Sequence, residues 1–154
     1  METTENSANT KIPILDLGPY LDGDIHACEV LASTLCGIQE NIGFYVVENH
    51  GVPQSLLDRA YAELEAFFAL PIEEKLKLKI NEKSVGYIPA KSTVYVTSII
   101  HENTQPDLNE TITIARERPP DDPAILAGNR FVGPNQWPEG LPSFRPAMIA
   151  YQKA

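Results

Sequence analysis

The segment Gly43–Pro53, GFYVVENHGVP, constrains the fold more than any other stretch of the sequence. Residues 44–48 carry aromatic and β-branched side chains, which indicates a buried β-strand. The next residues break the strand, because Asn tolerates and Gly readily adopts a left-handed backbone, while Pro suits the first turn of a helix. The segment therefore predicts a strand, a sharp corner and a helix start. The residues of this structural motif are Asn49, His50, Gly51 and Pro53.

Amphipathic helices are predicted on both sides of this strand, and we expect the two to pack on it and form the local core. The helix before it can be capped by Asp22 or Asp24. Its apolar side chains repeat at spacings of three and four, as on one helix face; they are Cys28, Leu31, Leu35, Ile38 and Ile42. The helix after it begins at Pro53 and has a similar face, formed by Leu57, Tyr61, Leu64 and Phe68 and widened by Ala60 and Phe67.

Leu70-Pro71 interrupts the second helix, and a short third helix follows with Glu73 and Glu74 in its first turn. The lysines of residues 75–83 lie toward and beyond its end, where the helix dipole favours cations. We interpret them as a solvated face paired with the two glutamates. A site for an anion is the alternative, and the acidity of the chain disfavours it.

Short strands are predicted for Ile12–Leu17 and, after Gly86, for VGYIP, TVYVTSII and NETITIAR. Seven of the 13 prolines lie between Pro119 and Pro146, which indicates a loop-rich connection into a helix that starts near Phe144. Trp137 in this connection is expected to anchor the loop on the domain. The predicted organisation is a disordered tail over 1–10, a domain over 11–118 and the proline-rich connection over 119–154.

The composition excludes several classes of protein. A net charge of −9 over 154 residues lacks the basic surface of a nucleic-acid binder and disfavours anionic membranes. The N-terminus has no signal-peptide pattern, and no apolar run is long enough to cross a bilayer. Cys28 and Cys36 would lie about 12 Å apart along one helix, which is too far for a disulfide. We expect a cytoplasmic protein with two reduced, buried cysteines.

Four motifs together resemble one family. IPILDLG (Ile12–Gly18), the GFYVVENHGVP segment, FFALPIEEK (Phe67–Lys75) and the PNQWP stretch near the C-terminus stand in the order and spacing of the N-terminal domain of non-haem iron, 2-oxoglutarate-dependent oxygenases. The isopenicillin N synthase-like group is the most similar. PDLNETITI (Pro106–Ile114) resembles an acidic-start strand of the same domain. The resemblance implies an α+β fold, helices packed on short strands, as the N-terminal portion of a double-stranded β-helix (jelly-roll) oxygenase whose catalytic jelly roll is absent.

The family's iron site uses two histidines and a carboxylate, the first pair spaced as H-x-D or H-x-E. None of His26, His50 and His101 has an acid two residues later, and the R-x-S pattern of a 2-oxoglutarate clamp is missing. No catalytic or metal-binding residue is therefore assigned, and we expect no cofactor on this chain alone. Fe(II) and 2-oxoglutarate are implied for a full-length form. We expect His50 to bond nearby backbone at the corner, and the other two histidines to be exposed.

One region carries a functional prediction. Gly86-Tyr87-Ile88 and Lys91 resemble the family's variable segment, whose side chains reach the mouth of the jelly roll, so Tyr87 and Lys91 are predicted to contact a substrate. The alternative is a sheet tyrosine and a surface lysine. The resemblance implies two partners, a catalytic jelly-roll domain and a small-molecule substrate, and an oxygenase shell that is inactive alone. A stand-alone, non-enzymatic binding or assembly module derived from this domain is the alternative function.

Overall fold

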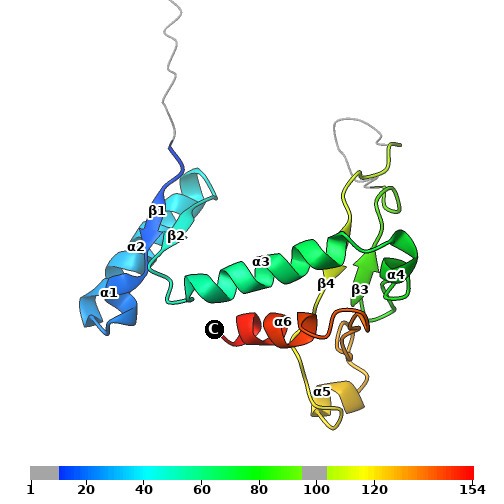
Figure 1. Ribbon diagram of the computed structural model, residues 1–154. Coiled ribbons are helices and arrows are strands. Elements are labelled where there is room, and N and C mark those ends of the chain that lie inside the picture. The colour runs from blue at the N-terminus through cyan, green and yellow to red at the C-terminus, as the bar shows by residue number, and fades with distance from the viewer. Residues whose placement is uncertain (1–10, 95–103) are drawn as a thin grey trace, which may run out of the picture. The chain divides into compact units, whose positions relative to one another are not determined.

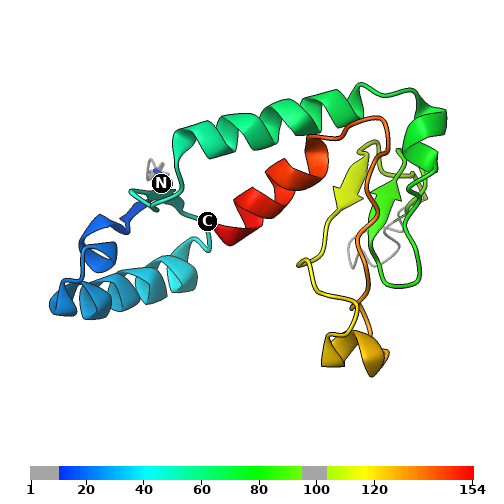
Figure 2. The same ribbon diagram turned by 60° about the horizontal axis from the view of Figure 1, so that its bottom comes forward.

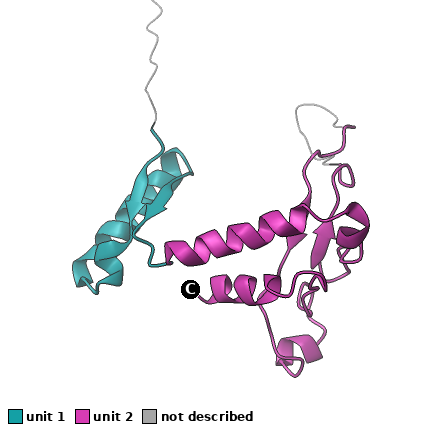
Figure 3. Cartoon of the chain, in the orientation of Figure 1, with its two compact units in different colours: residues 1–52 teal, residues 53–154 magenta. Residues whose placement is uncertain are grey.

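A computed structural model describes residues 11–94 and 104–154 of the chain. These residues form two compact units, divided between Val52 and Pro53 (Figure 3). The tail over 1–10, most of the strand expected over TVYVTSII, and His101 lie outside the described residues. The boundary expected at 118/119 stays a prediction, and residues on both sides of it belong to the second unit.

The first unit is a β-α-β arrangement. Strands β1 (Ile14–Asp16) and β2 (Val46–Glu48) pair in parallel, with Ile14 opposite Val46 and Asp16 opposite Glu48. Parallel neighbours need a crossover connection, which α1 (Gly18–Leu21) and α2 (Ile25–Asn41) provide. Both strands and the long helix were predicted, whereas the four-residue α1 was not.

Helix α2 begins and ends as its sequence indicates. The side chain of Asp24 accepts a hydrogen bond from the backbone N–H of His26 at 2.9 Å, which caps the first turn. At the other end, the N–H groups of Ile42 and Gly43 both donate to the carbonyl of Ile38. Gly43 has φ of 76°, the left-handed conformation that commonly ends a helix.

Two burial predictions for this unit are wrong. The strand over residues 44–48 is not buried, since Phe44 is 71% exposed and Val46 is 51% exposed. Cys28 and Cys36 are exposed as well. The reason is geometric: a helix of 17 residues meets strands of three residues each, so this unit buries Leu15 and Ile38 and leaves Cys28, at one end of the helix stripe, in solvent. Ile38 is the one buried residue of α2.

The second unit is built on two helices that lie side by side, α3 (Gln54–Phe68) and α6 (Phe144–Lys153) (Figures 1 and 2). Helix α4 (Ile72–Leu76) follows the Leu70-Pro71 interruption. Strands β3 (Gly86–Ile88) and β4 (Thr111–Thr113) then pair antiparallel, and α5 (Pro123–Leu126) lies in the proline-rich connection. All of these elements except α5 were predicted.

The main cluster of buried apolar residues lies in this second unit. Phe67 and Phe144 are fully buried with ring centroids 5.4 Å apart, and Tyr87 lies 6.0 Å from Phe67. Trp137 packs edge-on against Phe144 at 6.2 Å and so anchors the connection, as predicted. Within the second unit α3 packs on α6, and the apolar residues that they share include Ala60, Ala147 and Met148. The expectation that α3 packs on β2 stays a prediction.

The PNQWP motif joins distant segments through side-chain amides. Asn135 accepts from the N–H of Ala115 at 2.8 Å and donates to its carbonyl at 2.9 Å, as a neighbouring strand would. The amide of Gln136 donates to the carbonyls of Lys79 and Val85 at 3.0 and 2.8 Å. These bonds satisfy backbone groups of Ala115 and Lys79 and add a second donor to the carbonyl of Val85, which already accepts from the N–H of Asn81.

Candidate functional site

The corner after β2 is held by hydrogen bonds within the first unit. Asn49 and Gly51 have positive φ of 52° and 80°. The amide of Asn49 donates to a carboxylate oxygen of Asp16 at 2.8 Å, and the N–H of Gly18 donates to the same oxygen at 2.8 Å. These two bonds, the one from Asn49 first, lower the pKa of Asp16. His50 accepts from the N–H of Val52 through Nδ1 at 3.2 Å, so its ring serves the local backbone.

Tyr87 lies on β3 and is 1% exposed. Its hydroxyl donates to a carboxylate oxygen of Glu110, and the same oxygen accepts from Nζ of Lys75 at 2.8 Å. Lys75 also donates to the carbonyl of Phe68 at 2.9 Å, and its Nζ lies 5.5 Å from the centroid of the Tyr87 ring. Lys75, Tyr87 and Glu110 therefore form a polar cluster at the edge of the aromatic core, in which Lys75 and Tyr87 are buried and Glu110 is partly exposed.

The cluster shifts the ionisation of its members. Lys75, followed by the Tyr87 hydroxyl, holds the pKa of Glu110 below its usual value. Burial, together with the hydrogen bond to Glu110, raises the pKa of Tyr87 to about 12. The interpretation of the whole lysine run as a solvated face is thus wrong for Lys75, which is 7% exposed, although Lys77 does pair with Glu74 at 2.7 Å. Nothing in the helix pattern separates Lys75 from its neighbours, because its partner is 35 residues away.

Lys91 lies beyond β3 and is exposed. Its backbone has φ of 63°, and its N–H donates to the carbonyl of Asp107 at 2.7 Å. The N–H of Asp107 in turn donates to the carbonyl of Thr93 at 2.9 Å, so the start and the end of the β3–β4 connection are held together. The structure does not bring the side chains of Tyr87 and Lys91 together, and their contact with a substrate stays a prediction.

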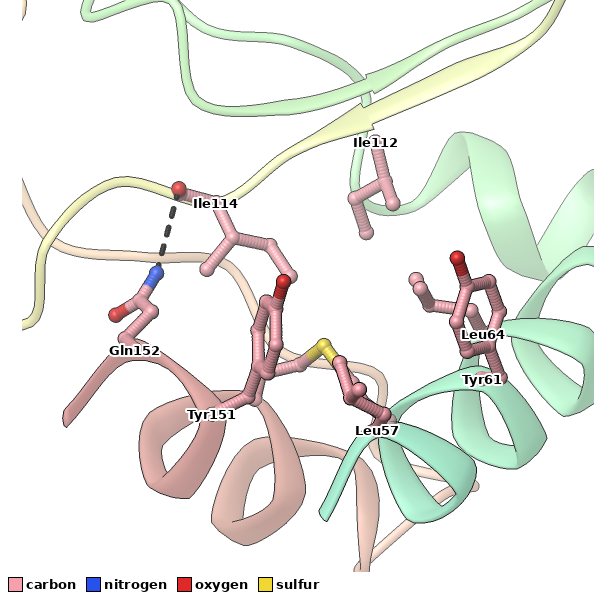
Figure 4. Close-up of a pocket in the computed structure, with 9 residues that line it drawn as sticks. Leu57, Tyr61, Leu64, Ile112, Ile114, Tyr151 and Gln152 are labelled. Carbon is pink, nitrogen blue, oxygen red and sulfur yellow. Dashed lines mark hydrogen bonds between the residues drawn. The ribbon is translucent and has the colours of Figure 1, made fainter. Parts of the chain in front are cut away.

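A groove that the sequence did not reveal lies between α3, β4 and α6 (Figure 4). It has a volume of about 350 Å³. Tyr61 and Tyr151, 66% and 45% exposed, border it, and Gln152 closes one end by donating to the carbonyl of Ala115 at 3.2 Å. The floor is apolar and is formed by Leu57, Ala60, Leu64, Ile112, Ile114 and Met148. The helical spacing of Leu57, Tyr61 and Leu64 indicated one face, but not that part of this face stays open.

Over 11–94 and 104–154, no three His, Cys, Asp or Glu side chains stand close enough together to hold a metal ion. His26 is exposed on α2, and the Nδ1 atom of His50 accepts a hydrogen bond from the backbone at the corner.

Among the helices of residues 11–94 and 104–154, none is long and apolar enough to span a membrane.

Comparison with known proteins decides the family. The model of the family described as "non-haem dioxygenase in morphine synthesis N-terminal" matches residues 12–140. The chain belongs to this family. The match to this dioxygenase domain includes the corner, the Lys75–Tyr87–Glu110 cluster and the PNQWP motif, and it confirms the resemblance drawn from the sequence motifs.

The relatives that this chain matches are longer proteins. The chain is 39% identical over 133 residues to azadirone synthase LFS of Melia azedarach, covering 84% of this chain and 37% of that protein. It is 32% identical over 152 residues to the 2-oxoglutarate-Fe(II) type oxidoreductase hxnY of Emericella nidulans, covering 96% and 42%. The chain thus spans about two-fifths of the length of the relatives it matches.

A solved structure supports the fold. A crystal structure from Caulobacter crescentus, described as a putative 2OG-Fe(II) oxygenase family protein, superimposes with a TM-score of 0.69 at 24% identity, covering 93% of this chain and 43% of that one. The mixture of helices and short strands described above is therefore a fold that part of this longer protein shares.

Proposed function

We propose that this chain is the N-terminal shell and substrate-entrance part of a cytoplasmic Fe(II)/2-oxoglutarate-dependent oxygenase that acts on a small molecule. The observation that carries the proposal is the family match over residues 12–140, together with relatives named as 2-oxoglutarate-dependent enzymes. In this proposal the chain works together with a catalytic jelly-roll domain, and it is inactive without one.

The metal-ligating side chains of this chain indicate which functions we assign to it and which to the catalytic domain. Because its histidines lack an acid at H-x-D or H-x-E spacing and no described cluster fits a metal, we assign iron and 2-oxoglutarate binding to the catalytic domain. The oxidising chemistry would be supplied there. The residues of this chain would shape the entrance, with Tyr87 buried on β3 and Lys91 exposed shortly after that strand.

The experiment compares the chain alone with a chimera. In the chimera, this chain replaces the 133 aligned residues of azadirone synthase. Both proteins are incubated with Fe(II), ascorbate and 2-oxoglutarate, and succinate is measured; the chimera also receives the precursor of azadirone. We expect succinate and azadirone from the chimera and no succinate above the metal-free blank from the isolated chain. Succinate from the isolated chain, or a chimera that does not fold, would contradict the proposal.

One observation favours the alternative of a stand-alone binding module. Residues 53–154 hold a core of their own, in which Phe67 and Phe144 are fully buried, and an open apolar groove that a ligand could enter. A module of this kind would be a stable monomer and would lend no activity to the chimera. The same pair of proteins therefore separates the two functions.

A further inference from the structure

The polar cluster of Lys75, Tyr87 and Glu110 lies where the β3–β4 connection begins and ends. Tyr87 is the middle residue of β3, and Glu110 directly precedes β4 (Figure 1). Tyr87 pairs with Ile112 in the strand register, so Glu110, two residues before Ile112, is its diagonal neighbour on the same face of the sheet. The hydrogen bond from Tyr87 to Glu110 therefore joins the strand before the connection to the segment that returns from it.

The backbone ladder between the two strands is short, so these ends need further contacts. The ladder comprises three residue pairs, and an isolated two-stranded sheet is marginally stable in water. Tyr87 itself is held by other parts of the unit. Its N–H donates to the carbonyl of Leu78 at 2.7 Å, and its carbonyl accepts from the N–H of Ile80 at 2.8 Å. Its ring packs on Phe67 in the core. Glu110 is thus bonded to a residue whose position the core fixes.

Lys75 keeps the Glu110 carboxylate at this position. Its Nζ donates to Glu110 at 2.8 Å and to the carbonyl of Phe68 at 2.9 Å, and the lysine is 7% exposed. Removing the carboxylate partner of a buried ammonium is strongly destabilising, because the charge is then uncompensated. The side chain of Glu110 is 34% exposed, more than those of its two partners. It could turn into solvent without Lys75 and Tyr87, and the two together hold it inward.

Backbone hydrogen bonds continue this link outward along the connection. We call its described flanks, residues 89–93 and 107–110, the neck. Within the neck, the N–H of Lys91 donates to the carbonyl of Asp107 at 2.7 Å, and the N–H of Asp107 donates to the carbonyl of Thr93 at 2.9 Å. Lys91 has φ of 63°, a conformation that a residue with a side chain keeps only where its surroundings impose it. The place of the exposed Lys91 side chain therefore depends on the two flanks of the neck staying together.

We propose that Lys75, Tyr87 and Glu110 are positioning residues, which fix the neck and thereby place the Lys91 side chain at the substrate entrance. This inference rests on the proposed function and deepens it, because it states how the entrance is held. Tyr87 acts here through Glu110 and needs no contact with a substrate. Three separate sequence motifs supply the residues, namely FFALPIEEK, Gly86-Tyr87-Ile88 and PDLNETITI.

The test uses the full chain and the azadirone synthase chimera, each with the same substitutions. Glu110→Ala removes the carboxylate, whereas Tyr87→Phe removes only the hydroxyl and keeps the ring in the core. Glu110→Gln is the conservative variant, since one oxygen of Glu110 accepts both hydrogen bonds and an amide oxygen can take its place. Glu74→Ala is the matched control, because Glu74 pairs with Lys77 at 2.7 Å on the surface.

Amide hydrogen exchange of the isolated chain measures the neck directly. In Tyr87→Phe and Glu110→Ala, the amides of Lys91 and Asp107 should exchange about tenfold faster or more, relative to the amides of α3 in the same variant. The reference to α3 removes a general loss of stability, which would speed the exchange of all these amides together. Glu110→Gln and Glu74→Ala should leave the ratio nearly unchanged. If Glu110→Ala does not fold, Tyr87→Phe carries the test.

Steady-state kinetics of the chimera measure the entrance. Tyr87→Phe and Glu110→Ala should raise KM for the azadirone precursor about fivefold or more and leave kcat of the folded enzyme nearly unchanged. Substitutions that only lower the folded fraction would reduce the apparent kcat and leave KM as it was. Glu110→Gln should restore KM, and Glu74→Ala should not alter it.

Two results would overturn the inference while the proposed function stands. One is an exchange ratio that does not change in Tyr87→Phe, which would mean that the cluster does not fix the neck. The other is an active chimera in which the neck amides exchange faster and KM stays constant, which would mean that the neck does not serve the entrance. A chimera that makes no azadirone without any of these substitutions contradicts the proposed function, and the entrance role fails with it.

Discussion

Tyr87 was predicted to contact a substrate, and its side chain is almost fully buried. Its ring packs on Phe67 and its hydroxyl donates to Glu110, so the folded protein favours the neutral phenol. The pKa of Tyr87 rises from 10.0 to about 12 on folding. A group whose pKa is raised in the folded state stabilises that state below the unfolded pKa, and the contribution is lost as the pH rises through the folded pKa.

The first prediction follows from the upward shift of the Tyr87 pKa on folding. Between about pH 10 and pH 12, the free energy of unfolding of the native chain should fall more steeply than that of Tyr87→Phe, because the variant has no phenol to ionise. At pH 8 the variant should be the less stable protein, since it lacks the bond to Glu110. Urea unfolding of both proteins across this range measures the difference. A difference in unfolding free energy between the two proteins that stays constant with pH would contradict the prediction.

Lys91 gives the second prediction, which concerns binding. In the chimera, Lys91→Ala should raise KM or lower kcat for azadirone formation and leave the melting temperature nearly unchanged, because the side chain is exposed. Lys153→Ala, at the end of α6, is the matched control and should change neither. Unaltered kinetics in the Lys91 variant would support the alternative of a plain surface lysine.

At the scale of elements, local signals predicted the helices and strands well. The cap at Asp24, the end at Gly43 and the interruption at Leu70-Pro71 each depend on a few neighbouring residues, and the structure has all three. Helix α5 was missed because prolines indicated only loop. In fact Pro123 occupies its first turn, and the side chain of Asp122 accepts from the N–H of Ala124.

Burial was harder to predict than secondary structure, because it depends on which elements meet. Phe44 is an aromatic residue of a predicted buried strand, yet it is exposed, whereas Lys75 is charged and is buried. The site shows the same limit. The roles of Tyr87 and Lys91 as substrate contacts stay predictions, and the bond from Tyr87 to Glu110 and the groove bordered by Tyr61 depend on segments far apart in the chain.

The third prediction concerns β3, where the chain passes very close to a neighbour. At Gly86, with φ of 123°, an added Cβ would lie 2.4 Å from the carbonyl oxygen of Leu78 and 2.5 Å from Nε2 of Gln136. Gly86→Ala should therefore cost roughly 3 kcal/mol or more of unfolding free energy, through strain and lost hydrogen bonds. Chemical denaturation measures it.

Gly128→Ala serves as the control for this prediction. Gly128 also has a positive φ, of 65°, but a Cβ there would meet nothing within 4 Å. The Gly128→Ala substitution should therefore lower the free energy of unfolding by only about 1 kcal/mol, the penalty of placing alanine in the left-handed conformation. Equal losses at the two positions would mean that the close approach at Gly86 contributes nothing.

On the scale of the whole molecule, the two units differ in what they bury. The second has an aromatic core around Phe67 and Phe144, whereas the first buries chiefly Leu15 and Ile38. Large apolar side chains remain exposed in both, among them Phe44 and Tyr61. Exposed apolar surface promotes association.

Our fourth prediction is that the isolated chain is marginally stable, binds hydrophobic dyes and elutes from gel filtration in a concentration-dependent way. Hydrogen exchange should be faster in α2 than in α3 and α6, since the first unit has fewer buried contacts to lose. A sharp monomer peak with one cooperative melt above about 60 °C would show instead a self-sufficient domain.

The separation of the two units also bears on the order in which the chain folds as it leaves the ribosome. All partners of the β1–β2 pairing lie within the first 52 residues, so that unit can form early in synthesis. The other unit cannot form so early, because Phe67 packs on Phe144, which is synthesised much later in the chain. Until then α3 is a nascent helix with an uncovered apolar face, which is the kind of segment that chaperones bind.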